Sequence, residues 1–308
     1  MSALPSIGFI GLGSMGGELA YRLANAGLPL VVYDSRSEAY ARFAGMDVTQ
    51  AANPAEVASR CETVCVCLPT PSIVQHVALG PSGLIEGDRM KVYVDMSTSG
   101  PAMAKLVANK LQERGVQSVD APVSGGVAGA RAGTLVLMVS GAPDTVAALE
   151  PIFGSLGKVS VIGPEVGQGQ SMKLINNMMA AAHLALAAEA TVLGVKAGLR
   201  AEVILDTLNS GSGKNSATED RFPKHVLPRT FNNGFANALM RKDVRLCMDM
   251  AEELQVPLWV GTAVDRLWMQ TVLQVGPNEN STSIVKTLEQ WAGVQVGQSP
   301  GAVPQARA

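Results

Sequence analysis

A glycine-rich segment near the start of the chain has the spacing of a phosphate-binding loop. It follows a short apolar run, Ile7 to Ile10, and reads Gly11-Leu12-Gly13-Ser14-Met15-Gly16. Between a strand and a helix, this G-x-G-x-x-G pattern is typical of dinucleotide binding, because its glycines allow a tight turn, approach to a pyrophosphate and close helix–strand packing. The helix N-terminus adds free N–H groups and positive partial charge. A turn with a purely structural role is the alternative.

The end of the next predicted strand indicates which nucleotide this loop binds. Asp34 closes the apolar run Leu30 to Tyr33, about 20 residues beyond the glycines, where a carboxylate accepts hydrogen bonds from ribose hydroxyls and repels a 2′-phosphate. Ser35 and Arg36 follow, and an arginine here either holds a 2′-phosphate or is a solvated loop residue. We therefore expect NAD as the cofactor and keep NADP open because of Arg36.

Polar or flexible segments follow three other predicted strands. In a doubly wound sheet the carboxyl ends of the strands line one crevice. The segments expected there are Leu68-Pro69-Thr70-Pro71, Asp95 to Ser99 and Asp120 to Gly126. We expect Leu68 and Pro69 to contact the cofactor. The hydroxyl of Ser124 and the N–H groups of Gly125 and Gly126 would cradle a carboxylate, although glycine and serine are common in ordinary loops.

Two later motifs place charged side chains on predicted helices. Lys173 and Asn177 are four residues apart and share a helix face. A partly buried lysine near a nicotinamide would exchange a proton with an alcohol; a lysine that only reaches water is the alternative. Farther on, Lys242 and Asp243 head another helix, where composition alone favours a solvated charge pair.

The elements that must position these residues fall into two parts. Up to Gly163-Pro164, apolar runs alternate with helical patterns, as in βαβ units, and beyond it only helices are evident. We predict an α/β fold in which a Rossmann-type, doubly wound dinucleotide-binding domain (residues 1–164) precedes an all-helical substrate and oligomerisation domain (165–293). A long interdomain helix is expected at about 170–197, and a mobile tail at 294–308.

Composition excludes several classes of function. Of the 308 residues 47% are hydrophobic, and the formal net charge of −2 leaves no broad basic field, so we expect no nucleic-acid partner. The longest apolar stretch, Leu174 to Val195, is interrupted by polar residues, which favours a buried helix over a membrane span. The cysteines do not suit a zinc site and no signal peptide is evident, so we expect no metal and a cytoplasmic location.

Together, these five motifs resemble those of the β-hydroxyacid dehydrogenase family, which includes 3-hydroxyisobutyrate dehydrogenase and tartronate semialdehyde reductase. Their order and spacing match from Ile7 to about Ala292. The resemblance implies a Rossmann-type N-terminal domain, a long interdomain helix and a helical domain that builds a homodimer or homotetramer. It also implies hydride transfer between a nicotinamide cofactor and a small β-hydroxy acid or its semialdehyde. The expected partner is thus a small-molecule carboxylate.

The resemblance also assigns roles to individual residues. Lys173 matches the family's catalytic lysine, and Lys242 matches the lysine that closes over the cofactor. Thr98 matches a residue near the nicotinamide, and Asn177 matches an amide that helps to hold the substrate. The segment Ser124 to Gly126 matches the substrate-carboxylate loop.

Two other functions stay open. One is imine reduction on the same scaffold, although imine-reducing relatives usually lack a lysine at the position of Lys173. The other is a non-catalytic nucleotide-binding module, against which the presence of Lys173 and Asn177 argues. Lys214 lies where family members vary with substrate, and it either adds a charge to the pocket or decorates a loop.

Overall fold

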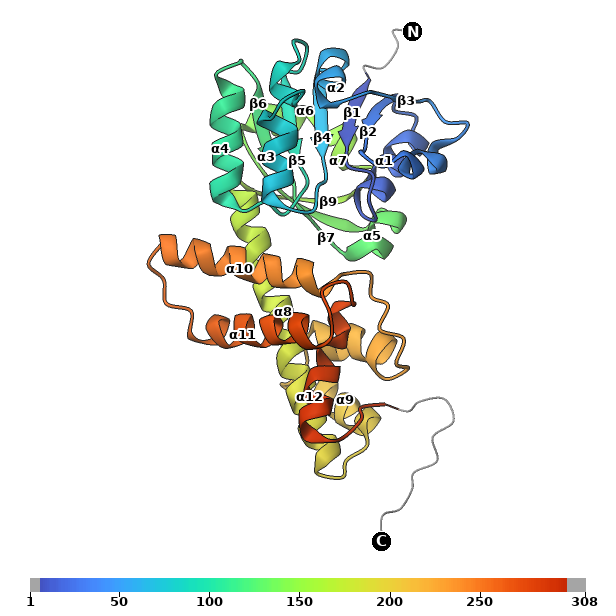
Figure 1. Cartoon of the computed structure of the whole chain (residues 1–308), viewed down its shortest axis with the longest axis vertical. Helices are drawn as coiled ribbons and strands as arrows, with labels where there is room; N and C mark the ends of the chain where they lie inside the picture. Colours follow the sequence, from blue (N-terminus) through green and yellow to red (C-terminus); the bar gives the residue numbers. More distant parts are fainter. Residues whose placement is uncertain (1–5, 298–308) are drawn as a thin grey trace. The chain divides into compact units, whose positions relative to one another are not determined.

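The computed structural model describes residues 6–297. These residues divide into two compact units, the first ending at Leu174 and the second beginning at Ile175. The first unit holds a sheet covered by helices, and the second consists of helices (Figure 1). These are the α/β and all-helical parts that the alternating pattern predicts. The predicted domain boundary at 164/165 falls just before the long helix α8 (Gln168–Lys196), whereas the division between the two units falls within that helix, after Leu174.

A single sheet organises the first unit. Its strands, within residues 6–297, are β1 (Ile7–Ile10), β2 (Leu30–Tyr33), β3 (Val48–Gln50), β4 (Thr63–Val66), β5 (Val92–Asp95), β6 (Gln117–Asp120), β7 (Val123–Ser124), β8 (Leu135–Ser140) and β9 (Gly157–Gly163). The strand order is β3-β2-β1-β4-β5-β6-β8-β7, and β9 pairs with β8. From β3 to β6 every pairing is parallel; β8 runs antiparallel to β6 and β7. The strands β1, β2 and β3 are added in one direction across the sheet, and β4, β5 and β6 are added in the other direction from β1. The strand order therefore reverses at β1, between β2 and β4, which is a switch point for ligand binding.

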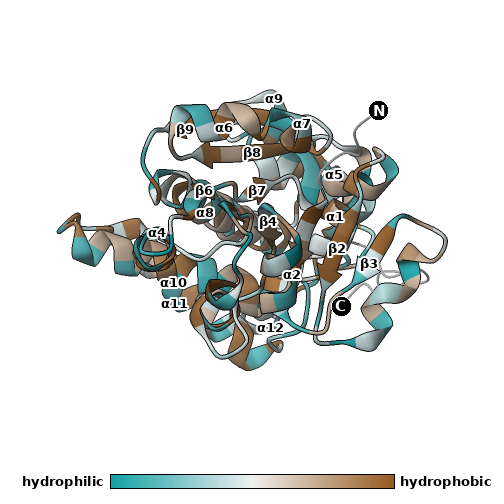
Figure 2. Ribbon diagram, turned by 90° about the horizontal axis from the view of Figure 1, so that it is seen from above, coloured by the Kyte–Doolittle hydropathy of each residue, from teal (hydrophilic) through white to brown (hydrophobic). Residues whose placement is uncertain are grey.

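Helices cover both faces of this sheet (Figure 2). They are α1 (Gly16–Asn25), α2 (Pro54–Arg60), α3 (Pro71–Leu79), α4 (Pro101–Gln112), α5 (Gly126–Ala132), α6 (Pro143–Ala148) and α7 (Glu150–Phe153), with the short turns η1 (Ser37–Phe43) and η2 (Leu84–Glu86). Successive strand residues point to opposite faces and enter two separate cores. Val32 and Cys65 join one core, and Val31 and Val64 join the other. With helices and a core on each face, the sheet is doubly wound.

Two short helices in this unit have N-terminal signals that the hydrophobic pattern alone does not reveal. Asn53 accepts a hydrogen bond from the Glu56 N–H and is followed by a proline that opens α2. Thr70 caps α3 in the same way, again before a proline. A capping side chain followed by proline at the first helical position is a strong helix start.

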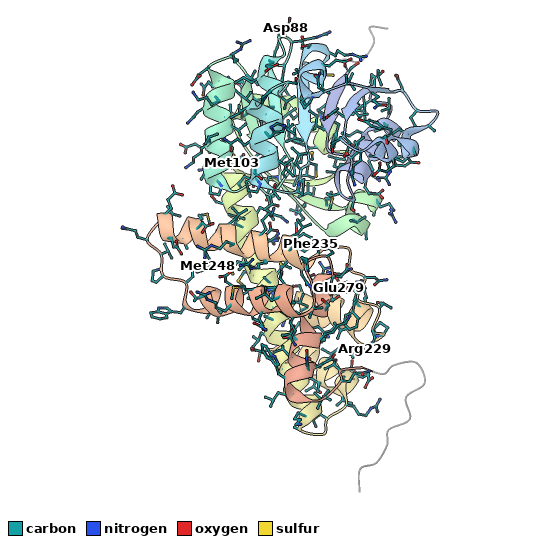
Figure 3. All side chains as sticks on the ribbon, in the orientation of Figure 1. Asp88, Met103, Arg229, Phe235, Met248 and Glu279 are labelled. Carbon is teal, nitrogen blue, oxygen red and sulfur yellow. The ribbon has the colours of Figure 1, made fainter. Side chains whose placement is uncertain are left out.

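The second unit is built from helices that surround α8. They are α9 (Ala201–Ser210), the wide π-type segment η3 (Ala217–Val226), α10 (Asn237–Glu253), α11 (Trp259–Gln274), the turn η4 (Ser281–Ser283) and α12 (Ile284–Ala292). Helices α10 and α11 pack side by side, and the segments around Phe235 and Glu279 meet nearby (Figure 3). Trp268 on α11 is fully buried and donates to the carbonyl of Ala181 on α8. The large apolar side chains of α8, η3, α11 and α12 thus form one core.

The packed part of the second unit extends beyond residue 293. Val296 is fully buried, its N–H donates to Glu289 Oε1, and its carbonyl accepts from Arg229, which Figure 3 labels. The tail was expected to be mobile from Val294, but its first residues are held by this buried contact, which composition does not reveal. The rest of the expected tail, 298–308, lies outside the described residues.

Within residues 6–297, one helix, α8, is long and apolar enough to cross a membrane, judged by length and composition alone. Such a helix is weak evidence of a span, because the core helices of soluble proteins pass the same test. In the most apolar 18-residue window of α8, 39% of the residues are buried inside the chain.

Three of the cysteines are buried thiols. Cys65 lies on β4 and joins the core on one face of the sheet, Cys61 precedes β4 and joins the core on the other face, and Cys247 lies on α10. They pack as small apolar side chains, as the alternating pattern around Cys65 predicts.

Candidate active site

The glycine-rich loop joins β1 to α1 in the first unit. Gly11 has a φ of +91°, and a Cβ atom built on it would lie 2.3 Å from the carbonyl oxygen of Cys67. A Cβ on Gly16 would lie 1.9 Å from the Gly11 carbonyl oxygen. A Cβ on Gly13, in contrast, would approach only the Arg36 guanidinium, at 3.6 Å. Two glycines are thus required by the fold itself, while the third leaves an open face on the loop.

The carboxylate of Asp34 lies against this loop. Its Oδ2 accepts the Leu12 N–H at 2.7 Å, and its Oδ1 accepts both the backbone N–H and the Nε of Arg36, at 2.9 and 3.0 Å. Burial alone would raise the pKa of Asp34, but the hydrogen bonds from Arg36 and Leu12 outweigh it and lower the pKa below its ordinary value. An ionised carboxylate therefore stands beside the loop.

A pocket of about 370 Å³ opens beside the loop and Arg36. Its lining comprises Leu12, Gly13, Ser14, Arg36, Glu38, Ala39, Ala41 and Arg42. Ser14 is exposed and Met15 half-buried, and Ser35 is exposed next to Asp34. The loop follows the carboxyl end of β1, and Asp34 and Arg36 follow the carboxyl end of the neighbouring strand β2. In a doubly wound sheet this is where the adenosine side of a dinucleotide is expected.

The segments after β4 and β5 are tied to each other. The Leu68 N–H donates to Ser97 Oγ at 2.9 Å, and the Ser97 N–H donates to Asp95 Oδ1 at 2.9 Å. Pro69 is exposed and Thr98 half-buried. The residues predicted to contact the cofactor after β4 and β5 therefore lie on neighbouring segments, at the carboxyl ends of two paired parallel strands.

The predicted carboxylate loop joins β7 to α5. Ser124 is half-buried at the end of β7, and Gly125 and Gly126 have φ values of +131° and +67°. A Cβ on Gly126 would meet nothing within 4 Å. The space around Gly126 is therefore open, two residues beyond the half-buried Ser124.

Lys173 lies in the first turns of α8 and is 7% exposed. It is thus a buried lysine, not one that simply reaches water. The turn before it is held by Asp120 and Gln170, two buried polar residues whose roles the sequence analysis did not identify.

In the second unit, three polar side chains meet between α8 and α10. The Asn177 amide donates to Asp243 Oδ2 at 2.5 Å, and Lys242 forms an ion pair with Asp243 Oδ1 at 3.0 Å. Asp243 is 2% exposed. The solvated charge pair favoured by composition is therefore wrong for Asp243, because the amide and the ammonium group replace water around its carboxylate. The sequence did not reveal the contact between Asp243 and Asn177, because the two residues are 66 positions apart.

Lys214 forms an ion pair with Glu219 at 2.7 Å, and both side chains are about half exposed. This position fits the loop-surface alternative. Among residues 6–297, no group of three or more His, Cys, Asp or Glu side chains is placed to hold a metal ion.

The predicted site residues thus form two sets. The set in the first unit lies at or after the carboxyl ends of strands, or in the first turns of α8. It comprises the glycine loop, Asp34, Arg36, Leu68, Pro69, Thr98, Ser124 to Gly126 and Lys173. In the second unit Asn177 and Lys242 converge on Asp243.

Comparison with known protein families covers both units. Residues 6–164 match the NAD binding domain of 6-phosphogluconate dehydrogenase. Residues 167–288 match the NAD-binding domain of NADP-dependent 3-hydroxyisobutyrate dehydrogenase. The two matches together span nearly all of the described chain.

Individual proteins agree with these matches. The chain is 32% identical to 2-(hydroxymethyl)glutarate dehydrogenase of Eubacterium barkeri, over 94% of this chain and 97% of that protein. It is 34% identical to mitochondrial 3-hydroxyisobutyrate dehydrogenase of Mus musculus, over 87% and 82% of the two chains. The structure of 3-hydroxyisobutyrate dehydrogenase from Mycobacterium tuberculosis superimposes with a TM-score of 0.82 at 28% identity, over 92% and 99% of the chains. An imine reductase from Pseudomonas is more distant, at 18% identity and a TM-score of 0.60, and shares the fold alone. The chain therefore belongs to the β-hydroxyacid dehydrogenase family.

Proposed function

We propose that the chain is an NAD(P)-dependent dehydrogenase that transfers a hydride between the nicotinamide and a small β-hydroxy acid or its semialdehyde. The observation that carries the proposal is the buried Lys173, held in the unit that also contains the dinucleotide loop. Relatives named as dehydrogenases of 3-hydroxyisobutyrate, 2-(hydroxymethyl)glutarate and L-threonate support the substrate class.

The residues present fit a nicotinamide dinucleotide. The open face at Gly13 admits a pyrophosphate, and the carboxylate of Asp34 is placed for ribose hydroxyls. Because the guanidinium of Arg36 pairs with Asp34, it is turned toward the carboxylate that repels a 2′-phosphate. We therefore propose NAD as the preferred cofactor, with NADP use requiring Arg36 to leave this pair.

When bound, the nicotinamide supplies a hydride acceptor or donor. The loop Ser124 to Gly126 fixes the substrate carboxylate, and Asn177 orients the substrate. In the oxidative direction the neutral amine of Lys173 takes the hydroxyl proton at Nζ. In reduction the same atom returns a proton to the developing alkoxide and stabilises its charge. Thr98, Leu68 and Pro69 would contact the cofactor, and Lys242 would close over it.

Formation of reduced cofactor tests this proposal. Purified protein is assayed with NAD and, separately, NADP against 3-hydroxyisobutyrate, glycerate, 3-hydroxypropionate, serine and threonate. We expect Lys173→Ala to lower kcat by about 100-fold or more while cofactor affinity is kept. Lys110→Ala, which removes an exposed lysine from α4, is the matched control.

Each alternative function has its own outcome in this assay. Near-normal turnover by Lys173→Ala would remove Lys173 from the catalytic role. Turnover of cyclic imines without alcohol oxidation would favour imine reduction. Tight cofactor binding without turnover of any hydroxy acid, semialdehyde or imine would favour a nucleotide-binding module.

We also propose that the helical unit builds a homodimer or homotetramer. Four large apolar side chains on α8, Ile175, Met179, Leu186 and Leu193, are 48% to 71% exposed, and their spacing of four, seven and seven residues places them along one stripe. Contiguous exposed apolar surface of this kind marks an interaction site.

Light scattering after size-exclusion chromatography tests the oligomer. We expect Leu186→Glu with Leu193→Glu to reduce the mass to that of one chain, whereas Leu254→Glu, at an exposed site after α10, leaves the mass unchanged. A wild-type mass of 32.0 kDa would contradict the proposal. The cytoplasmic location remains a proposal based on the sequence pattern.

A further inference from the structure

Helix α8 begins against the carboxyl ends of β6 and β8, in a cluster of buried polar side chains. Asp120 ends β6, Ser140 ends β8 and Gln170 lies in the first turn of α8; all three are at most 1% exposed. The proposed reaction uses none of them directly. Polar groups buried so completely are nearly always hydrogen-bonded, and in this cluster the hydrogen bonds run between the strand ends, the loop after β5 and the first turn of α8.

The carboxylate of Asp120, at the end of β6, caps the N-terminus of α8. Its Oδ2 accepts the Gly167 N–H at 2.6 Å and the Gln170 N–H at 3.4 Å. These are N–H groups that the first turn of a helix leaves without an intrahelical partner. An N-terminal capping residue normally satisfies them locally, whereas here a strand end does so. The start of α8 is therefore fixed to β6, not only to its own preceding loop.

Ser140 makes a second attachment, from β8. Its hydroxyl donates to Asp120 Oδ2 at 2.9 Å and accepts the Gly169 N–H at 2.8 Å. The helix backbone lies so close to the sheet that a Cβ on Gly169 would be 2.5 Å from the Met138 carbonyl oxygen. This close approach sets the distance between helix and sheet as well as their register.

Gln170 makes a third attachment, to the segment that carries Thr98. Its Oε1 accepts the N–H groups of Ser99 and Gly100, at 3.0 and 3.2 Å, and its Nε2 donates to the Ser97 carbonyl at 3.0 Å. The loop after β5 and the first turn of α8 are thereby joined through one side chain.

Lys173 follows this attached turn directly. It is three residues beyond Gln170 and four beyond Gly169, so it lies on the same side of the helix, one turn farther on. Any shift or rotation of the first turn is carried to its Nζ atom. Since a misplacement of about 1 Å in a catalytic group costs about 100-fold in rate, the attachments bear on turnover and not only on folding.

We propose that Asp120, supported by Ser140, is a positioning residue that fixes the first turn of α8 and thereby the Nζ atom of Lys173. This inference rests on the proposed catalytic role of Lys173. Asp120 acts through the helix backbone and touches neither the substrate nor the cofactor. Its removal should therefore lower kcat while leaving the affinities for cofactor and substrate nearly unchanged.

A double-mutant cycle between Asp120 and Lys173 tests the proposal. Asp120→Asn keeps the side-chain shape but replaces the carboxylate with a weaker acceptor. In the Lys173 enzyme we expect it to lower kcat by about 10- to 100-fold, with the NAD dissociation constant and the substrate KM within about twofold. In the Lys173→Ala background, measured by single turnover with and without added methylamine as a diffusible base, it should change the rate by less than about twofold. Asp144→Asn, an exposed carboxylate on α6, is the matched control.

Each result separates the inference from the proposed function. An equal loss in both backgrounds, or no loss in the Lys173 enzyme, would overturn the positioning role. Full turnover by Lys173→Ala would instead reject the catalytic role of Lys173. If Asp120→Asn does not fold, Ser140→Ala enters the same cycle, with an expected loss of about three- to tenfold in the Lys173 enzyme and none in Lys173→Ala.

Discussion

Two aspartates occupy equivalent places in the sheet but experience opposite environments. Asp34 directly follows β2 and Asp120 is the last residue of β6. Asp34 faces a guanidinium near solvent, and its pKa is lowered. Burial raises the pKa of Asp120 to about 6, although hydrogen bonds from Gly167 and Ser140 oppose this rise, and the carboxylate of neighbouring Asp95 adds to it. A cationic partner thus outweighs partial burial, whereas hydrogen bonds from neutral groups do not outweigh complete burial.

The largest expected effect compares the two positions by removing each carboxylate. Asp120→Ala leaves buried N–H and O–H donors without an acceptor, each at a cost of about 1–3 kcal/mol, and we expect a total loss of about 3 kcal/mol in the free energy of unfolding. Asp34→Ala opens a site that water reaches and should cost about 1 kcal/mol. Urea unfolding followed by circular dichroism measures both. Equal losses would show that burial does not distinguish these carboxylates.

The next effect concerns cofactor choice. Asp34→Ala removes the acceptor for the ribose hydroxyls and releases Arg36, so we expect NAD to bind about 10- to 100-fold more weakly and NADP to bind more tightly. Titration of the purified protein with each cofactor, followed by intrinsic fluorescence or calorimetry, measures the change. Asp120→Asn serves as the comparison, because it should leave the preference for NAD intact.

The pH dependence of stability should have opposite signs at the two sites. The folded-state pKa of Asp120, about 6, is above its ordinary value of 3.8, so the stability that its proton adds is fully present below 3.8 and is lost as pH rises through 6. Between pH 7 and pH 5, the wild type should gain about 1 kcal/mol relative to Asp120→Asn.

Asp34, with its lowered pKa, adds stability that is present above 3.8 and is lost as the pH falls below that value. The wild type should therefore lose stability relative to Asp34→Asn in acid. Unfolding free energies of the three proteins from about pH 2 to about pH 7.5 measure both trends, and parallel curves for the two variants would contradict the comparison.

The smallest effect belongs to the ion pair itself. Because the Arg36 side chain is about half exposed, Arg36→Ala should change the free energy of unfolding by less than about 0.5 kcal/mol, and added salt should reduce even this. A larger effect of Arg36→Ala is expected only on the affinity for NADP. A loss of stability above 1 kcal/mol at 0.5 M salt would show that the pair is structural.

Local patterns in the sequence predicted much of the first unit. The glycine loop, the strand ends at Asp34 and Asp120 and the helix that carries Lys173 depend on short spacings, and the structure has each of these elements where it was expected. Helices α2 and α3 were not predicted, although the pairs Asn53-Pro54 and Thr70-Pro71 could have revealed them.

Contacts between residues far apart in the chain could not be predicted in this way. The bonds from Gln170 to Ser99 and from Asn177 to Asp243 join residues about 70 positions apart, and neither has a local pattern. The burial of Val296 depends likewise on Arg229 and Glu289, which composition does not associate with a chain end. The roles of individual site residues remain proposals that the experiments above test.

The buried cysteines make the two units separately observable. Burial raises the pKa of Cys61 to about 11 and that of Cys65 to about 12, and it also raises the pKa of Cys247. Since alkylating reagents attack the thiolate, these thiols react only when the surrounding core opens. Cys65 reports on the sheet, and Cys247, buried on α10, reports on the helical unit. Mass spectrometry of labelled peptides would therefore give the opening rate of each unit from the unmodified protein, before and after cofactor is added.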